Sequence, residues 1–384
     1  MKIAVVHDWL VCYAGAERVL EQILLCFPGA DLFTIVDFLP QNEREFIGDS
    51  EVTSSFIQSL PFSKRHYRSY FSLMPIAIEQ FDLSSYDVVI SSSHAVAKGV
   101  ITGPDQIHIS YLYTPIRYIW DLQPQYLRQT GLDKGFKSWV VRLIFHKIRI
   151  WDLRTVNSVD YFITSSKFIQ RRIRKFYGRK AEIIPPPVAL SKFTISDKNM
   201  KEEFYMTASR MVPYKRIDLI VDAFSEMPDK QLVIIGDGPE MDKIKRRATK
   251  NVEILGFQPE DVLIDYLQRA KAFIFAAEED FGIAPLEAQA CGTPVLAYGK
   301  GGALETIIGA GETEEKDIAQ TGLFFYEQTT TSIQNAVELF ENSRTRITSN
   351  ACRMNAIRFS PEKFRNKFKT YVLQKVHDFS TNQP

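Results

Sequence analysis

Residues 273–290, F-I-F-A-A-E-E-D-F-G-I-A-P-L-E-A-Q-A, place two carboxylates around a glycine turn. Residues 273–275 form an apolar run that is typical of a buried strand, and the residues after 284 have helical character. Glu279 and Glu287 stand on opposite sides of this turn. Short apolar strands that lead into helices are the building units of a parallel sheet covered on both faces. Because ligands bind outside the carboxyl ends of such strands, this turn is a candidate site.

The same alternation occurs on both sides of a proline-rich segment. Three consecutive prolines at 185–187 cannot lie inside a central strand or helix, so this segment is a linker. We predict an α/β protein with two doubly wound, Rossmann-like domains that face a central cleft, at 1–187 and 188–360, followed by a C-terminal helix within 361–384. The predicted strands are 3–6, 87–90, 107–111, 161–164, 204–208, 232–236, 252–256, 272–275 and 294–297. The predicted helices are 16–26, 215–224, 240–250 and 361–378.

Composition excludes several classes of protein. A chain of 384 residues suits two domains, and its apolar content of 45% is ordinary for a globular protein. A net charge of +1 gives no sign of nucleic-acid binding. The four cysteines form no C-x-x-C pair and have no histidine at metal-binding spacing, which favours buried thiols in a reducing, cytoplasmic setting. We expect no signal peptide and no membrane-spanning segment.

Positive charge is concentrated in residues 134–180. This segment has 13 Lys or Arg and two acids, Asp152 and Asp160. Apolar residues recur within it at three- and four-residue steps, which predicts a helix with an apolar stripe and a basic face. That face is either a solvated side of a core-packed helix or a surface for anionic lipid or an anionic acceptor. The second alternative predicts peripheral contact with the inner face of the plasma membrane. The stripe consists of Phe136, Trp139, Val140, Leu143, Ile144, Ile148 and Trp151.

Two loops of the first domain carry candidate residues. Gly15 opens the first predicted helix in G-A-E-R, where backbone N–H groups can approach an anion or a sugar. His94 follows S-S-S directly after a predicted strand. A single histidine is often a packed or solvated residue, but at this position its imidazole could bind a sugar hydroxyl or exchange a proton.

Two loops of the second domain point to a phosphate group. Arg210 and Lys215 flank the turn of S-R-M-V-P-Y-K-R at a strand–helix junction. An arginine fork, a lysine charge and a helix N-terminus together can clamp a diphosphate, although two surface cations are the alternative. Gly236 lies in I-G-D-G-P-E, which matches neither G-x-G-x-x-G nor the P-loop pattern. We interpret this segment as a close-approach turn near a nucleotide.

The two carboxylates of the opening segment have two interpretations. Glu279 can accept hydrogen bonds from the hydroxyls of a sugar ring, and Glu287 can accept them from the hydroxyl pair of a ribose. They could instead be the acid and base of a glycosidase. However, a cationic diphosphate clamp has no role in a hydrolase, so we favour the binding of a nucleotide-sugar.

These segments together resemble the retaining glycosyltransferases of family 4, which have the GT-B architecture. The resemblance covers residues 203–310 and rests on A-S-R-M-V-P-Y-K-R, I-G-D-G-P-E, E-D-F-G-I-A-P-L-E-A with its Glu-x7-Glu spacing, and A-C-G-T-P-V-L-A-Y-G-K-G-G-A-L-E-T-I. The segments K-I-A-V-V-H-D-W-L, G-A-E-R-V-L and S-S-S-H-A-V-A-K-G-V resemble bacterial O-antigen and capsule mannosyltransferases. Two positions depart from the family pattern, because Ala14 and Asp280 stand where glycine is frequent.

The resemblance implies roles for the candidate residues. Arg210 and Lys215 would bind the donor diphosphate and neutralise the leaving group, and Glu287 would hold the ribose. Glu279 would hold the transferred sugar. The first domain would bind the acceptor, and the last helix would cross back to it. The remaining implied contacts are the amides of Phe281, Gly282 and Ile283 at sugar and phosphate, His94 near the reaction centre, and Gly15 at the diphosphate and acceptor. From its own turn, Gly236 is predicted to lie at the donor.

The function we predict is transfer of a hexose, foremost mannose from GDP-mannose, with retention of configuration. The acceptor would be lipid-linked or an oligosaccharide in O-antigen, lipopolysaccharide, capsule or exopolysaccharide synthesis. No Asp-x-Asp motif occurs, so we expect neither a metal nor another cofactor. The alternatives are a UDP-sugar transferase, an epimerase, phosphorylase or synthase of the same architecture, and a glycan- or nucleotide-binding module. The missing G-x-G-x-x-G argues against a dehydrogenase.

Overall fold

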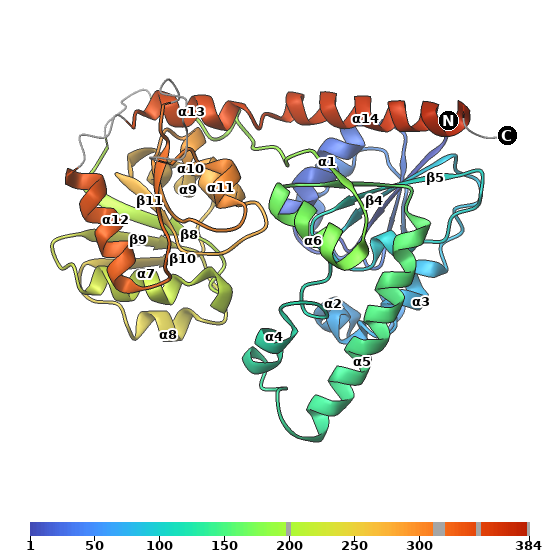
Figure 1. The fold of residues 1–384 in the computed structure, drawn as a ribbon, viewed down its shortest axis with the longest axis horizontal. Helices are drawn as coiled ribbons and strands as arrows, with labels where there is room; N and C mark the ends of the chain where they lie inside the picture. The colour runs from blue at the N-terminus through green and yellow to red at the C-terminus, as the bar shows by residue number, and fades with distance from the viewer. Residues whose placement is uncertain (197–200, 310–318, 343–346, 382–384) are drawn as a thin grey trace. The chain divides into compact units, whose positions relative to one another are not determined.

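The computed structural model describes residues 1–196, 201–309, 319–342 and 347–381 (Figure 1). The chain forms two compact units. The first contains residues 1–185 together with the residues from 364 onward, and the second contains residues 186–363. Each unit is built on its own parallel sheet, with helices on both faces of that sheet.

The first unit has a seven-stranded sheet in the order β3-β2-β1-β4-β5-β6-β7, and each described pairing is parallel. The chain order reverses between β1 and β4, and this reversal is the usual place for a ligand in a doubly wound sheet. The strands are β1 Ile3–His7, β2 Asp31–Thr34, β3 Val52–Ser54, β4 Val88–Ser93, β5 Ile107–Leu112, β6 Tyr161–Thr164 and β7 Ala181–Ile183. The helices are α1 Gly15–Cys26, α2 Ser63–His66, α3 Met74–Glu79, α4 Gln123–Gln129, α5 Gly135–Arg154, α6 Lys167–Tyr177 and α14 Pro361–Thr381.

Both faces of this first sheet are buried. Val5 and Val6 are neighbours on β1, and their side chains enter different hydrophobic clusters because successive residues of a strand point to opposite faces. On the Val5 side, α14 adds Phe364 and Phe368, whose rings stack at a centroid distance of 5.5 Å. The C-terminal helix therefore completes the core of the first unit.

The second unit has a six-stranded parallel sheet in the order β10-β9-β8-β11-β12-β13. Its chain order reverses between β8 and β11, so the loops after these strands lie at the switch point. The strands are β8 Phe204–Ala208, β9 Gln231–Ile235, β10 Val252–Gly256, β11 Ala272–Phe275, β12 Val295–Tyr298 and β13 Gly322–Phe325. The helices are α7 Ile217–Ser225, α8 Met241–Lys245, α9 Glu260–Arg269, α10 Ile283–Ala290, α11 Ala303–Thr306, α12 Thr330–Asn342 and α13 Ser349–Ile357.

The sequence predicted the central strands better than the edges. The fold class is confirmed, and each predicted strand is present within one or two residues at most ends. Four strands were missed, namely β2, β3, β7 and β13. The edge strands β3 and β7 have three residues each and are at least partly exposed, so they present no apolar run to recognise.

Two helix predictions in the second unit were wrong in their bounds. The helix expected over 215–224 begins at Ile217, because residues Pro213–Lys215 form a 3-10 turn and Arg216 is left-handed with φ 55°. The helix expected over 240–250 ends at Lys245. Lys215 therefore belongs to a turn that precedes a helix and does not lie in the helix itself.

Candidate functional site

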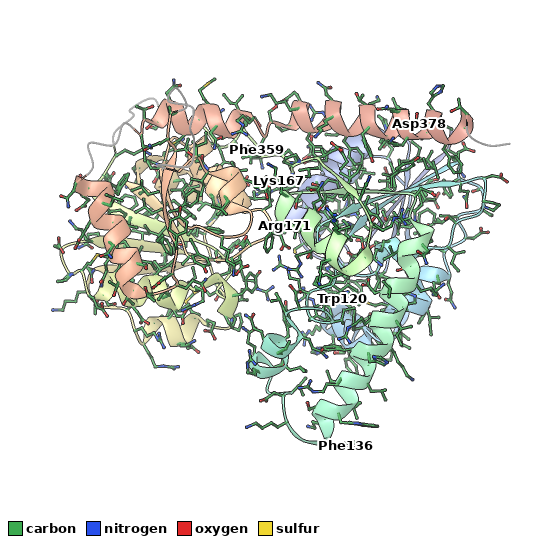
Figure 2. All side chains as sticks on the ribbon, viewed as in Figure 1. Trp120, Phe136, Lys167, Arg171, Phe359 and Asp378 are labelled. Carbon is green, nitrogen blue, oxygen red and sulfur yellow. The ribbon has the colours of Figure 1, made fainter. Side chains whose placement is uncertain are left out.

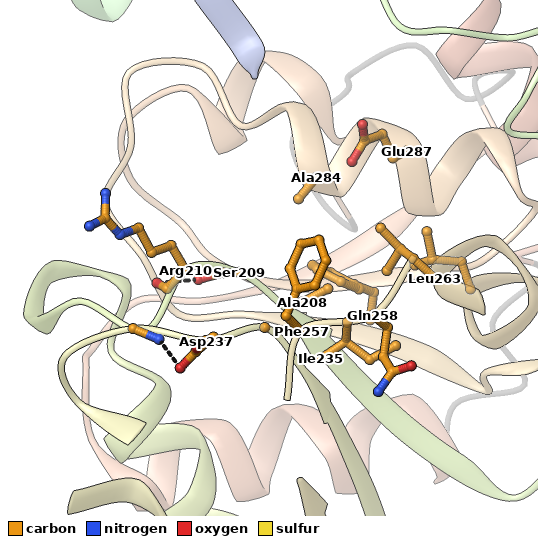
Figure 3. A pocket seen from close by; sticks show the side chains of 14 residues that line it. Ala208, Ser209, Arg210, Ile235, Asp237, Phe257, Gln258, Leu263, Ala284 and Glu287 are labelled. Carbon is orange, nitrogen blue, oxygen red and sulfur yellow. Dashed lines mark hydrogen bonds between the residues drawn. The ribbon is translucent and has the colours of Figure 1, made fainter. Parts of the chain in front are cut away.

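A pocket of about 560 Å³ lies beside the loops that follow β8, β9 and β10 and beside α10 (Figure 3). One part of its wall is apolar and another part is polar. Arg210 and Glu287 both line it, so the structure brings these two predicted residues to one pocket. The lining residues are Ala208, Ser209, Arg210, Ile235, Gly236, Asp237, Gly238, Phe257, Gln258, Leu263, Leu267, Phe273, Ala284 and Glu287.

Gly236 holds two of these loops together. A Cβ at this position would lie 2.0 Å from the carbonyl oxygen of Ser209, and its φ of +133° disfavours other residues. The backbone N–H of Ser209 donates to Ile235 O at 3.0 Å, and that of Met211 donates to Asp237 O at 2.8 Å. The close approach that the sequence indicated is thus between two loops of the protein, and it positions Arg210.

The predicted diphosphate clamp is divided between two places. Arg210 lines the pocket, is exposed, and forms no ion pair with a carboxylate in the described ranges. Lys215 lies on the 3-10 turn Pro213–Lys215, and its ammonium group forms an ion pair with the Glu279 carboxylate. The side chains of Lys215 and Glu279 are 17% and 15% exposed, so this pair sits at the surface edge of the unit in a partly dry environment.

A second glycine segment holds the turn that carries Glu279. The backbone N–H of Gly302 donates to Glu279 O at 2.8 Å, and Glu279 forms an isolated bridge with Gly301. A Cβ on Gly302 would lie 2.3 Å from the Cα of Phe281, so only glycine fits. Sequence reasoning gave no role to these two glycines, although the segment G-K-G-G was part of the recognised pattern.

The turn ends in α10. Gly282 is the N-cap and Ile283 the first helical residue, so backbone N–H groups of this turn belong to a helix N-terminus. The side chain of Phe281 packs into the core against Phe359, at a ring distance of 5.7 Å, so only its backbone remains for a ligand. Glu287 lies one turn into the helix, is buried, and reaches the pocket from there.

In the first unit, His94 is oriented by a residue that the sequence analysis did not single out. Asp8 is fully buried, and its carboxylate lies 3.0 Å from Nδ1 of His94. The same carboxylate accepts backbone N–H bonds from residues 94–97, at 2.6 to 2.9 Å. Burial by itself would raise the pKa of Asp8, but the charge and hydrogen bonds of His94 hold that pKa well below its ordinary value. An ionised Asp8 therefore fixes the His94 ring, and Nε2 is the remaining atom for chemistry.

The register of the sheet explains this contact. His7 on β1 is the partner of Ser92 on β4, so the residues that follow both strands meet at the carboxyl edge. Trp9 then packs edge-on against His94, with ring centroids 4.5 Å apart. The segment H-D-W-L was part of the resemblance, but only the pairing of β1 with β4 shows that its aspartate meets His94.

Gly15 is the first residue of α1 and lies in the same set of loops. Its neighbour Ala14 donates its backbone N–H to the buried Glu17 carboxylate at 3.0 Å. Burial opposes ionisation of Glu17, but the His7 imidazole, whose Nε2 lies 3.6 Å from the carboxylate, lowers its pKa. The hydroxyl of Tyr113 donates to Ala16 O at 2.9 Å, which fixes the helix start from the β5 side. The position of Gly15 is thus set by the buried Glu17 on α1 and by Tyr113, which directly follows β5.

Residues 191–359 match a family model described as "Glycosyl transferases group 1". A GDP-mannose-dependent monoacylated alpha-(1-6)-phosphatidylinositol monomannoside mannosyltransferase of Corynebacterium glutamicum is 33% identical over 178 residues, which are 39% of this chain and 47% of that protein. The corresponding GDP-mannose-dependent enzyme of Mycolicibacterium smegmatis is 29% identical over 184 residues, or 40% of this chain and 48% of that protein. The chain therefore spans about half the length of the curated relatives it matches.

A solved structure supports the fold of the whole chain. Anabaena Alr3699/HepE in complex with UDP and glucose is similar with a TM-score of 0.67 at 17% identity, over 97% of this chain and 99% of that one. At this identity the likeness concerns the fold. The chain has the GT-B fold class, and the match to the group 1 glycosyl transferase model is confined to residues 191–359. The two relatives named above are not O-antigen or capsule enzymes, so they do not support that narrower resemblance.

Two further observations concern metal ligands and membrane-spanning helices. No group of three or more His, Cys, Asp or Glu residues in the described ranges is arranged to hold a metal ion. Among the helices of the described part, none is long and apolar enough to cross a membrane.

Proposed function

We propose that this chain is a retaining glycosyltransferase that uses a nucleotide-sugar donor. The observation that carries this proposal is the pocket in which Arg210 and Glu287 both stand beside an apolar wall. The apolar wall, formed in part by Leu263 and Leu267, suits a nucleobase. Glu287 suits the hydroxyl pair of a ribose, and the Arg210 guanidinium suits a phosphate.

Transfer requires that the bond between the sugar and the phosphate break. Positive charge then develops on the sugar, and negative charge on the nucleoside diphosphate. In our proposal Arg210 and Lys215 act on the leaving group, where fixed cations stabilise the transition state more than the ground state. The Lys215–Glu279 pair places a cation for phosphate beside a carboxylate for the sugar hydroxyls. The backbone N–H groups of Gly282 and Ile283, at the start of α10, add donors for sugar and phosphate.

The first unit is proposed to bind the acceptor. His94, held by Asp8, would contact the transferred sugar near the reaction centre, and Gly15 would leave room for the acceptor and the diphosphate. Neither role needs a metal. The cationic groups take the place that a divalent ion has in other sugar transferases.

The donor we propose is GDP-mannose, because both curated relatives named above are described as GDP-mannose-dependent. A UDP-sugar is the alternative, since the similar HepE structure holds UDP. The acceptor we propose is lipid-linked or an oligosaccharide, and the names of the two relatives favour a lipid-linked one. A cytoplasmic enzyme that works peripherally at the inner face of the plasma membrane would suit such an acceptor.

The test is calorimetric titration of the full chain with GDP, UDP and NAD in the presence of EDTA. We expect GDP to bind, and Arg210→Ala and Lys215→Ala each to weaken that binding at least tenfold, because each removes a charge-assisted contact to phosphate. Lys192→Ala is the matched control, since Lys192 is a solvent-exposed lysine of the same unit whose ion pair is with Glu260. Binding of UDP in place of GDP would retain the transferase and overturn the mannose assignment. Unchanged affinity in both variants would refute the diphosphate site.

Turnover separates an enzyme from a binding module. Lys215→Ala in a transferase should lower the rate of sugar transfer, or of donor hydrolysis, by orders of magnitude. A glycan-binding module would retain its affinity for glycan in this variant and show no turnover in the wild type.

A further inference from the structure

Helix α5 has two apolar faces, and only one of them is packed. The inner face includes Ile144 and Ile148, which join a hydrophobic cluster of the first unit, with Ile148 only 4% exposed. The outer face exposes apolar side chains near both ends of the helix, with Phe136 78% and Trp139 62% exposed. The single stripe predicted from sequence is therefore two stripes. The exposed residues are Phe136, Trp139, Leu143, Ile150 and Leu153, and we call them the outer face.

The outer face belongs to a rigidly mounted helix. Near its C-terminal end, the buried Asp152 accepts hydrogen bonds from Trp120 Nε1 and the Tyr177 hydroxyl, both at 2.8 Å. The Arg149 guanidinium donates to Ile119 O at 2.7 Å. Phe136 lies at the other end, where the chain turns from α4 into α5 (Figure 2). The inner side of α5 packs on this unit, whereas the outer face remains exposed.

Positive charge is concentrated in α5 and in the residues just before it. From residue 128 to residue 151 the sequence has six Lys or Arg and one acid, Asp133. Lys134, Lys137 and Lys147 are exposed, and none of them forms an ion pair with a carboxylate of the described residues. The stacked rings of Phe136 and Trp139, 6.2 Å apart, thus belong to a segment that also exposes Lys134 and Lys137.

We propose that the outer face of α5 is a docking surface for a membrane that contains anionic lipids. Aromatic and aliphatic side chains can enter the boundary between head groups and acyl chains, while the flanking lysines remain at the level of the phosphates. The Trp139 indole favours this boundary because it combines an apolar ring with a polar N–H, and the lysines are attracted by the negative surface potential. The proposal stands on α5 alone and does not require that the chain be a transferase.

The charge argues against two other occupants. A second copy of this chain that docked face to face would bring the same cations together, and like charges repel at close range. A neutral partner surface would leave the lysines without compensation. An anionic bilayer can bury the apolar side chains of the outer face and bind the lysines through its phosphate groups at the same time.

The experiment is co-sedimentation of the full chain with vesicles of phosphatidylcholine alone or of phosphatidylcholine with 30% phosphatidylglycerol. We expect binding to the anionic vesicles that weakens with salt, because the cations act through a screened field. Phe136→Ser/Trp139→Ser should lower the partition coefficient at least tenfold through loss of the apolar contacts. Lys134→Gln/Lys137→Gln/Lys147→Gln should lower it roughly 100-fold on anionic vesicles.

Controls on the second unit keep the result specific. Leu339 and Met354 are 55% and 56% exposed, so Leu339→Ser/Met354→Ser removes comparable apolar surface elsewhere and should leave binding unchanged. Circular dichroism and affinity for GDP or UDP check that each variant is folded. Failure of wild type to sediment with anionic vesicles at low salt would overturn the proposal. Binding of both α5 variants as strong as that of wild type would also overturn it. A dimer in solution that dissociates in Phe136→Ser/Trp139→Ser would assign the face to a second copy and overturn it too.

Discussion

Removal of the Lys98 charge should destabilise the first unit strongly. Lys98 and Asp152 are both fully buried, and the ammonium nitrogen lies 2.9 Å from a carboxylate oxygen. Lys98 also donates to Asp152 O at 2.9 Å and to the Thr155 hydroxyl at 2.5 Å. The pair joins residues Ala97–Gly99 to the C-terminal end of α5 and so anchors the helix that carries the outer face.

The variant Lys98→Met keeps the length of the side chain and removes the charge. Asp152 then remains buried with hydrogen bonds from Trp120 and Tyr177 but with no cation. Loss of one partner of a buried pair costs about 3–5 kcal/mol, because the other charge stays uncompensated in a medium of low polarity. For a unit of this size we expect the unfolding midpoint to fall by roughly 10 °C, at about 2–4 °C per kcal/mol.

Urea unfolding followed by tryptophan fluorescence measures this loss. Lys98→Met/Asp152→Asn should be more stable than Lys98→Met alone, because it leaves no buried charge behind. The matched control is Lys367→Met, which removes an exposed ion pair with Glu182 in the same unit and should cost less than about 1 kcal/mol. A cost below about 1 kcal/mol for Lys98→Met, or a double variant less stable than the single one, would refute the reasoning.

Two further predictions concern the site. Gly302→Ala should lower the free energy of unfolding by about 1–3 kcal/mol and weaken donor binding, since its Cβ would displace the backbone of Phe281 and with it the Glu279 turn. Gly103→Ala is the control, because the nearest atom to its Cβ would be 3.5 Å away. Equal stability of the two variants in urea would contradict the argument. Asp8→Asn should lower stability at pH 7 by about 1.5–3 kcal/mol, because four backbone N–H groups lose an ionised acceptor. The pKa of Asp8 is depressed in the folded state, so its contribution is present above the ordinary value of 3.8 and is lost as pH falls below it. The difference between wild type and Asp8→Asn in urea unfolding should therefore shrink from pH 7 to pH 3, and a constant difference would contradict an ionised Asp8.

The sequence predicted those features that depend only on the residues of one segment. The apolar runs of the central strands predicted two parallel sheets, because strands buried on both faces must be apolar at nearly each position. The prolines at 185–187 marked the region where one compact unit ends and the next begins. Arg210 and Glu287 were named from motifs, and both line one pocket. Their roles in binding a donor stay predictions.

Relations between distant segments required the tertiary structure. Asp8 and His94 are separated by more than eighty positions, and they meet only because β1 pairs with β4 in one particular register. Gly302 holds the Glu279 turn through a contact of backbones that leaves no pattern in composition or spacing. For α5 the sequence showed that apolar and basic residues lie on one helix, because the three- and four-residue spacing of the apolar residues indicates a helix. Which of those apolar residues pack and which face solvent depends on the surface that the rest of the unit offers, and this only the folded chain decides.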